Sequence, residues 1–297
     1  KYKNILVHFL DENMWEVLKD FVEELDIIVW VHGAEVQPWY RRDFNYKTED
    51  ERNDAKKKSD VRISFWKQLF KDLHEKVKFV FVSQYFASEV MEDVGITLSK
   101  EQYTIIHNPI ATDIFDYKIK DIEQRKKLLS IRPYASAKYA NDLTVKAILV
   151  LSKKPWFNEL EIRMIGDGIL FDEILEPLRK FENIIIERGF LTQQEIANLH
   201  KQYGIFLTPT RMDAQGVSRD EAMSSGLVPI TNAVTAIPEF VDESCGILAP
   251  SDDFLVMAEG IEKLYNKPEM FLQMSENAAK RVRTQTSPEY TIQKEID

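Results

Sequence analysis

Short apolar runs alternate with segments of helical periodicity over the first hundred residues. The runs read as buried strands and the segments between them as amphipathic helices. The expected strands are 3–9, 26–33, 78–83 and 103–110, and the expected helices are 12–25 and 84–94. A strand, helix, strand order at this spacing predicts parallel pairing with right-handed crossovers. Pro109 stops the last strand and turns the chain.

The same alternation restarts in the second half of the chain. The expected strands are 128–133, 160–168, 183–190, 204–210 and 227–232, and the expected helices are 141–152, 170–180, 193–202, 252–265 and 268–284. The pattern predicts an α/β protein with two parallel-sheet domains. We expect the first domain at residues 1–115, the second at 116–285 and an irregular polar tail at 286–297.

Composition supports this picture and excludes some functions. The chain has 297 residues, more than one hydrophobic core usually serves, so two domains are expected. No apolar run approaches the about 18 to 20 residues that span a bilayer, and no signal-peptide pattern is present. The single cysteine, Cys245, excludes an internal disulfide and favours a cytoplasmic location. The net charge of −10 argues against nucleic-acid binding.

Residues 41–78 differ from the rest of the chain in charge. They hold twelve Lys and Arg against eight Asp and Glu, a local +4 in a chain that totals −10, so the remainder carries −14. Trp66, Leu69, Phe70 and Leu73 recur at the spacing of one helix face. Such a segment either packs its apolar stripe on its own domain or covers another surface, which is the inner face of a membrane or a ligand site that it closes over. The pattern favours the first interpretation and leaves the second open.

The stretch 206–226 carries the strongest chemical signal. It begins as an apolar strand, breaks at Pro209 into a polar loop and resumes as a helix. Asp213 on the loop and Glu221 in the helix lie eight positions apart, so both carboxylates can face a ligand at the helix entrance. Helix N-terminal N–H groups bind anions, and carboxylates accept hydrogen bonds from vicinal hydroxyls. A sugar nucleotide offers phosphate and hydroxyls in this arrangement.

Two cations follow the first strand of the second domain. Arg132 lies at its end and Lys138 six residues on, just before a helix, which predicts a diphosphate clamp. In the first domain, His32 and Gly33 lie at the carboxyl end of a strand, where open parallel sheets bind ligands. The alternative for His32 is an ordinary hydrogen-bonded histidine at a strand end. We expect His8 to be structural, because it lies within a strand.

In these motifs and in their order along the chain, the protein resembles a retaining glycosyltransferase of the GT-B fold, from the large family 4 group. The resemblance runs from His32 to about Asp253 and is strongest from Leu128 onward. That family has two acidic residues separated by seven others, in the setting Pro-Ser/Thr…Glu-Gly-Phe-Gly…Glu-Ala-Met-Ala-x-Gly. Residues 209–226 read PTRMDAQGVSRDEAMSSG. The resemblance implies two Rossmann-like domains facing a cleft.

The resemblance also implies a role for each matching residue. Glu221 matches the acid that holds the ribose hydroxyls, and Asp213 matches the acid that contacts the transferred sugar. Arg132 and Lys138 match the pair that neutralises the diphosphate, and His32 matches a histidine near the donor sugar. The other donor-binding matches are Gly33, Asn108, Gly166, Asp167, Arg188, Gly189, Phe190, Leu191, Gln215, Gly216 and Val217.

Two features depart from the family pattern. Asp213 stands where the family has Glu, and Ala214-Gln215 replaces Gly-Phe, so the reach toward the sugar changes. The first domain is short, and we expect it to be incomplete because the family's opening strands have no counterpart.

The resemblance implies transfer of a sugar from a nucleoside-diphosphate sugar to a hydroxyl of a glycan or lipid-linked acceptor, with retention at the anomeric carbon, in polysaccharide assembly. Neither a metal nor another cofactor is expected, because no Asp-x-Asp motif or histidine cluster at metal spacing is present. Two alternatives are a non-catalytic sugar-nucleotide-binding module of a larger polysaccharide-assembly protein and a sugar-nucleotide epimerase on the same fold.

Overall fold

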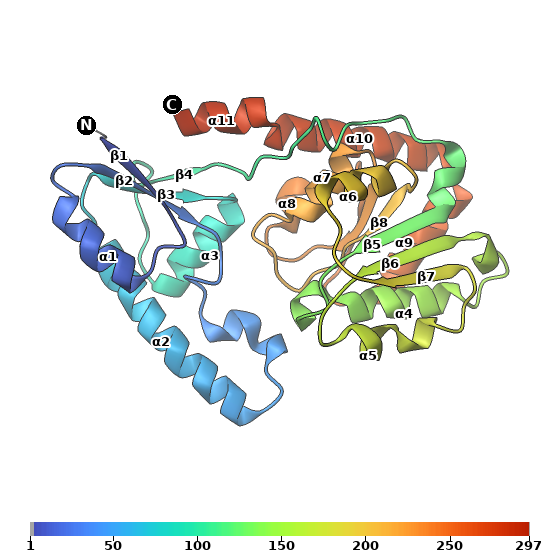
Figure 1. Ribbon diagram of the computed structural model, residues 1–297, viewed down its shortest axis with the longest axis horizontal. Helices are drawn as coiled ribbons and strands as arrows, with labels where there is room; N and C mark the ends of the chain where they lie inside the picture. Colours follow the sequence, from blue (N-terminus) through green and yellow to red (C-terminus); the bar gives the residue numbers. More distant parts are fainter. Residues whose placement is uncertain (1–2, 297) are drawn as a thin grey trace. The chain divides into compact units, whose positions relative to one another are not determined.

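The computed structural model describes residues 3–296 (Figure 1). Lys1, Tyr2 and Asp297, which belong to the predicted first domain and tail, lie outside the described residues. The chain divides into two compact units, Lys1–His107 and Asn108–Asp297. The boundary predicted after residue 115 lies a little further along the chain than this division.

The first unit is built on a four-stranded parallel sheet in the order β1-β2-β3-β4. Its strands are β1 (Asn4–His8), β2 (Asp26–Val31), β3 (Val77–Phe81) and β4 (Tyr103–Ile105). Its helices are α1 (Glu12–Leu18), α2 (Glu49–Lys71) and α3 (Gln84–Val94), with 3-10 segments η1 (Lys19–Phe21) and η2 (Trp39–Asn45). The four predicted strands are confirmed, whereas the helix predicted over 12–25 ends at Leu18.

The apolar stripe of the basic segment 41–78 faces the interior of its own unit. Trp66, Leu69 and Phe70 on α2 are buried. The rings of Trp66 and Phe70 lie with their centroids 6.0 and 4.9 Å from that of Phe79 on β3. Burying these side chains is strongly favourable, so they are not available to a membrane. Of the two interpretations of the stripe, the structure supports packing on its own domain.

The second unit contains a six-stranded parallel sheet in the order β10-β9-β8-β5-β6-β7. Its strands are β5 (Lys127–Ile131), β6 (Glu161–Gly166), β7 (Ile184–Arg188), β8 (Ile205–Leu207), β9 (Val228–Asn232) and β10 (Ile247–Ala249). The chain moves outward from β5 through β6 to β7, returns to β8 beside β5, and then moves outward on the other side. This reversal is the doubly wound Rossmann arrangement.

Helices cover both faces of this sheet (Figure 1). The helices of the unit are α4 (Asn141–Leu151), α5 (Phe171–Leu175), α6 (Gln193–His200), α7 (Val217–Ser224), α8 (Ile237–Phe240), α9 (Phe254–Asn266), α10 (Pro268–Thr286) and α11 (Pro288–Ile296), with 3-10 segments η3 (Ile122–Lys126), η4 (Ala137–Tyr139), η5 (Phe157–Glu159) and η6 (Glu176–Leu178). The helix α11 continues beyond α10 and does not lie on the sheet. Successive residues of a strand point to opposite faces. Accordingly, Leu128 clusters with Ile148 of α4, and its neighbour Leu129 clusters with Leu199 of α6 and Ala222 of α7.

Two predicted elements of the second unit need correction. The helix predicted over 170–180 divides into α5 and η6, because Pro177 has no N–H to continue the α-helical ladder.

The tail predicted to be irregular forms the helix α11 in its described part. Pro288 lies in the first turn, where its missing N–H breaks no helical bond. Thr291 is buried, and its hydroxyl donates to Ser287 O at 3.1 Å. The polar composition of this segment gave no sign of the helix, which is held by the burial of Thr291.

Candidate functional site

The strand order of the second sheet reverses between β5 and β8. The loops that leave the carboxyl ends of two such strands diverge, and ligands of open α/β sheets bind in the crevice between them. Here the loops comprise residues 132–140 after β5 and 208–216 after β8. Predicted site residues on them are Arg132, Lys138, Asp213, Gln215 and Gly216.

Arg132 follows β5 directly, and its side chain is buried. Its Nη1 donates to Ser218 Oγ at 3.2 Å, and its Nη2 reaches Pro209 O at 3.4 Å. Its Nε has no hydrogen-bond partner among residues 3–296. Burial lowers the pKa of Arg132, and the neighbouring Asp213 carboxylate acts in the opposite direction. A buried guanidinium with an unused N–H is costly, so the group is suited to an anion that completes its bonds.

Tyr139 brings the two predicted cations together. Its ring centroid lies 5.1 Å from the guanidinium carbon of Arg132 and 5.7 Å from Lys138 Nζ. Lys138 lies in η4, where Ser136 Oγ accepts from Lys138 N at 3.1 Å. The two cations beside one aromatic ring make the carboxyl end of β5 positively charged. Tyr139 was not predicted as a site residue, although its place directly after Lys138 offered a signal.

The loop after β8 is fastened to α4 by a bidentate ion pair. Arg211 Nη1 and Nη2 each lie 2.9 Å from an Asp142 carboxylate oxygen. Burial by itself raises the pKa of Asp142, but the bonds and charge of Arg211 bring that pKa below its ordinary value. Arg211 N also donates to Lys138 O at 2.8 Å. The two loops of the crevice are therefore tied together through Arg211.

Gly216 precedes α7 with a φ of 101°, a left-handed conformation that favours glycine. No side chain caps this helix. The N–H groups of Arg219 and Asp220 donate to Gly216 O, whereas those of Val217 and Ser218 have no acceptor within the described chain. Open N–H groups at a helix N-terminus are an anion-binding arrangement.

Asp213 is half-buried and fixed through its backbone. Asp213 N donates to Thr235 Oγ1 at 2.9 Å, and that hydroxyl donates back to Asp213 O at 2.9 Å. One carboxylate oxygen, Oδ1, accepts weakly from Gln215 N at 3.4 Å. The other, Oδ2, has no partner among residues 3–296, so the carboxylate can accept a hydroxyl.

Glu221 lies in the second turn of α7 and is half-buried. Burial, and then the charge of Asp220, raise the pKa of Glu221 to about 7. No described residue donates a hydrogen bond to its carboxylate. A carboxyl held in this way near neutral pH gains free energy from a ligand hydroxyl that donates to it.

Gln215 is buried, and its side chain is used within the protein. Its Oε1 accepts from Asn108 N at 2.7 Å, and its Nε2 donates to Asn108 O at 3.1 Å and Asp220 Oδ2 at 3.0 Å. Asp220 in turn pairs with the buried Arg219, whose Nη2 lies 2.6 Å from Asp220 Oδ1. The network holds the loop in front of α7. Nothing in the sequence distinguished Arg219 and Asp220 from ordinary surface charges of a helix.

The turn Gly166-Asp167-Gly168 at the end of β6 packs against the loop after β5. A Cβ on Gly166 would lie 1.9 Å from Arg132 O, and one on Gly168 would lie 2.2 Å from the carbonyl carbon of Tyr134. Both glycines are therefore required by the close approach of two backbone segments. Through this contact they position Arg132.

Residues 188–191, which match donor-binding positions of the family, lie at the neighbouring strand ends. Arg188 Nε lies 2.8 Å from Asp167 Oδ1, which joins the ends of β6 and β7. Gly189 N donates to the carbonyl of the first glycine of the turn. Leu191 packs on the core, whereas Phe190 is 80% exposed. An exposed aromatic face at this edge is available for stacking.

In the first unit, His32 and Gly33 follow β2 at its carboxyl end, as predicted. The Glu35 carboxylate accepts from both of their backbone N–H groups, at 2.8 Å for Gly33. His32 is half-buried, and burial lowers its pKa. Its Nε2 lies 2.9 Å from Nδ1 of His8. His8 is exposed and contacts a predicted site residue, which the sequence did not reveal.

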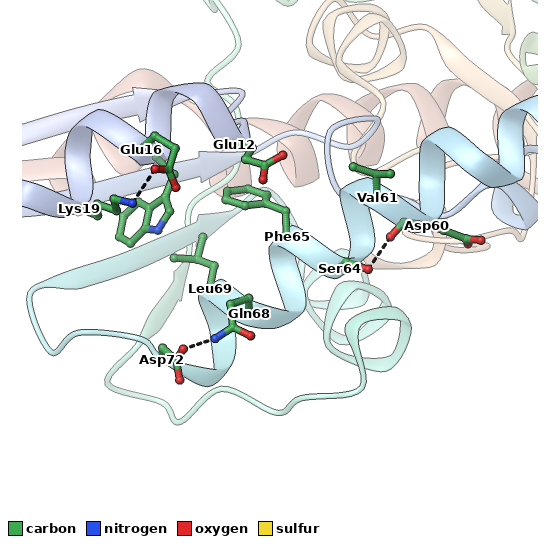
Figure 2. Close-up of a pocket in the computed structure, with 11 residues that line it drawn as sticks. Glu12, Glu16, Lys19, Asp60, Val61, Ser64, Phe65, Gln68, Leu69 and Asp72 are labelled. Carbon is green, nitrogen blue, oxygen red and sulfur yellow. Dashed lines mark hydrogen bonds and ion pairs between the residues drawn. The ribbon is translucent and has the colours of Figure 1, made fainter.

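A separate groove of about 680 Å³ lies between α1 and α2 of the first unit (Figure 2). Phe65 faces it, and the Glu16–Lys19 and Gln68–Asp72 pairs lie along it. None of the predicted site residues lines this groove. It lies beside two helices and not at the carboxyl ends of strands, so we assign the candidate site to the crevice of the second unit.

Residues 3–296 contain neither a cluster of metal ligands nor a membrane-spanning helix. Across residues 3–296, no three His, Cys, Asp or Glu side chains gather as metal ligands would. In the same range, no helix combines the length and apolar character needed to cross a membrane.

Comparison with known proteins relates this geometry to a family. Residues 125–267 match the family model described as Glycosyl transferases group 1. An uncharacterized glycosyltransferase of Haemophilus influenzae is 25% identical over 177 residues, which cover 59% of this chain and 48% of that protein. The match thus spans about half the length of this curated relative.

Solved structures extend the likeness to the whole fold. A mutant TarM of S. aureus matches with a TM-score of 0.69 at 16% identity, over 92% of this chain and 50% of that chain. Sucrose-phosphate synthase of Thermosynechococcus elongatus matches with a TM-score of 0.77 at 15% identity, over 99% of this chain and 72% of that chain. The predicted fold class, α/β with two parallel sheets, is confirmed. Residues 125–267 therefore resemble the Glycosyl transferases group 1 family, and the chain as a whole shares the α/β fold of GT-B glycosyltransferases.

Proposed function

We propose that this protein is a retaining glycosyltransferase of the family 4 group, which moves a sugar from a nucleoside-diphosphate donor to a hydroxyl of a glycan or lipid-linked acceptor. The observation that carries the proposal is the pair of cations at the carboxyl end of β5, where the strand order of the sheet reverses. Arg132 and Lys138 flank Tyr139 there, and α7 on the adjoining loop begins with open N–H groups. An anionic ligand such as a diphosphate fits both features.

The chemical difficulty is the departure of the diphosphate, on which negative charge develops. Cations and helix N-terminal N–H groups fixed in advance stabilise that charge without reorganising. Arg132 is fixed by burial, and the backbone of Lys138 is fixed by Arg211. Asp213 and Glu221 present carboxylates that accept hydroxyls of the sugar and of the ribose. No step of this proposal uses a metal.

A donor sugar linked to uridine diphosphate is supported by TarM, whose structure contains UDP and alpha-GlcNAc-glycerol. We place the reaction in polysaccharide assembly in the cytoplasm. Peripheral membrane contact through 41–78 would rest on the basic side chains alone, because the apolar stripe is buried.

Calorimetry with UDP-, GDP- and ADP-glucose, followed by a turnover assay, tests the proposal. We expect Lys138→Ala to weaken donor binding by about 10- to 100-fold, the value of a charge-assisted bond, and Glu221→Ala to reduce turnover sharply. Lys180→Ala is the matched control, since Lys180 is an exposed lysine of the same unit that lies outside the two crevice loops.

Each outcome of this experiment has a clear meaning. Donor binding in folded Lys138→Ala that equals wild type would sink the site assignment. Binding without turnover favours a non-catalytic module, and conversion of one nucleotide sugar into its epimer favours an epimerase.

A further inference from the structure

Two histidines from adjacent strands form a pair at the carboxyl edge of the first sheet. His8 ends β1, and His32 follows β2. His8 Nδ1 and His32 Nε2 lie 2.9 Å apart, at hydrogen-bond distance. The ring of His8 also stacks on Trp30, with centroids 5.3 Å apart. Trp30 on β2 therefore supports the ring of His8 in this pair.

Phe9 follows β1 directly and covers one face of the His32 ring. Its ring stacks on that of His32 with centroids 4.4 Å apart and planes at 26°. Phe9 has a φ of 56°, a left-handed conformation that non-glycine residues rarely adopt. The buried Leu10 and the cap that Asp11 gives to Met14 N hold the chain in this turn. Strained residues of this kind cluster at functional sites.

The hydrogen bonding of the pair follows from the chemistry of imidazole. A neutral ring has one N–H donor and one acceptor nitrogen. If His8 Nδ1 donates, His8 Nε2 is an acceptor and His32 Nδ1 carries a proton. If His32 Nε2 donates, the two outer nitrogens exchange these roles. In both arrangements the pair presents one donor and one acceptor outward, and neither outer nitrogen has a partner within residues 3–296.

We propose that His8 is a positioning residue that fixes the tautomer and orientation of His32, so that the pair binds sugar hydroxyls through its two outer nitrogens. One donor and one acceptor match the hydroxyl group, which both donates and accepts. Phe9 keeps the His32 ring from turning away. The identity of the ligand rests on the proposed function, whereas the positioning of His32 by His8 does not.

Nuclear magnetic resonance of the 297-residue chain with ¹⁵N-labelled histidine tests the pairing directly. The wild type should show one tautomer for His32. His8→Phe keeps a ring on Trp30 but removes the nitrogen, and it should leave His32 as a mixture of tautomers. Phe9→Leu should loosen the ring without removing the bond. His74→Gln, a histidine elsewhere in the same unit, is the control and should leave the His32 signals unchanged.

Addition of UDP-, GDP- and ADP-glucose then tests the ligand. A panel sugar that binds by calorimetry should shift the signals of both outer nitrogens, and His8→Phe should raise the KM for that sugar by about 3- to 10-fold, the value of one neutral hydrogen bond. An unchanged His32 tautomer in His8→Phe overturns the proposal, as does calorimetric binding with no shift at either histidine. If no panel sugar binds, the proposed function fails, and the tautomer of the free protein still decides the pairing.

Discussion

Replacing Glu221 with Gln tests the electrostatics of α7. The Glu221 carboxyl is half-buried next to the buried Asp220, and these surroundings raise its pKa from 4.5 to about 7. Gln has nearly the same shape and no charge. The variant therefore removes the cost of holding a carboxylate at this position in the folded protein.

The size of the effect follows from the two pKa values. A pKa near 7 in the folded state against 4.5 in the unfolded chain corresponds to about 3 kcal/mol, at about 1.4 kcal/mol for each tenfold change in proton affinity. Between these pH values the folded state binds the proton more tightly than the unfolded chain. The free energy of unfolding of the wild type therefore falls as pH rises from about 4.5 to about 7 and the penalty is fully present above that range. Because the side chain is partly exposed, about 3 kcal/mol is an upper value.

Urea unfolding of wild type and Glu221→Gln at pH 4 and pH 8 measures the difference. We expect the variant to gain up to about 3 kcal/mol relative to wild type between pH 4 and pH 8. Glu243→Gln, which changes an exposed carboxylate of the same unit, controls for the general loss of one charge. A difference between Glu221→Gln and wild type that is the same at both pH values would refute the reasoning.

Three further predictions concern the two loops of the crevice. Gly216→Ala should destabilise the fold by about 2 kcal/mol or more, because a Cβ there would lie 2.8 Å from Arg219 Nη1, whereas the control Gly95→Ala, with a φ of 75° and no atom within 4 Å, should cost only about 1 kcal/mol. Urea unfolding compares the two variants, and equal losses of stability would contradict the steric argument. Arg211→Lys should cost about 1 kcal/mol, since an ammonium cannot reproduce both bonds to Asp142, and a thermal midpoint equal to that of wild type would argue against the tie between the loops. Chelation by EDTA should leave turnover unchanged, because in the proposed reaction Arg132 and Lys138 stabilise the leaving diphosphate. Loss of turnover that Mg²⁺ restores would show that a metal shares this role.

Local chemistry in the sequence was sufficient to place most elements. Alternation of apolar and amphipathic segments predicted the strands of both sheets except β10, because a parallel strand that is covered by helices must be apolar along its length. The motif at 209–226 located the loop and helix of the crevice. Pro177 could also have been read as the end of a helix. The helix α11 was missed because its anchor is tertiary, through the burial of Thr291.

In each unit, the pairing of particular polar side chains depended on contacts that no local pattern contains. Gln215 looks like an exposed loop residue in the sequence, yet it is buried between Asn108 and Asp220. His8 looked like a structural strand residue, yet β1 and β2 pair in a register that brings its ring to His32.

By itself, then, the sequence determined the α/β class, the parallel strands and the residues that can bind phosphate and hydroxyls, because these follow from periodicity and from side-chain chemistry. Only the tertiary structure decided that β8 returns to the side of β5, which brings the loop of Arg132 to the loop of Asp213. It also decided which polar side chains stay open at the crevice and which form hydrogen bonds inside the protein. Those outcomes depend on strand order, register and burial, and each of these is set by residues far apart in the chain.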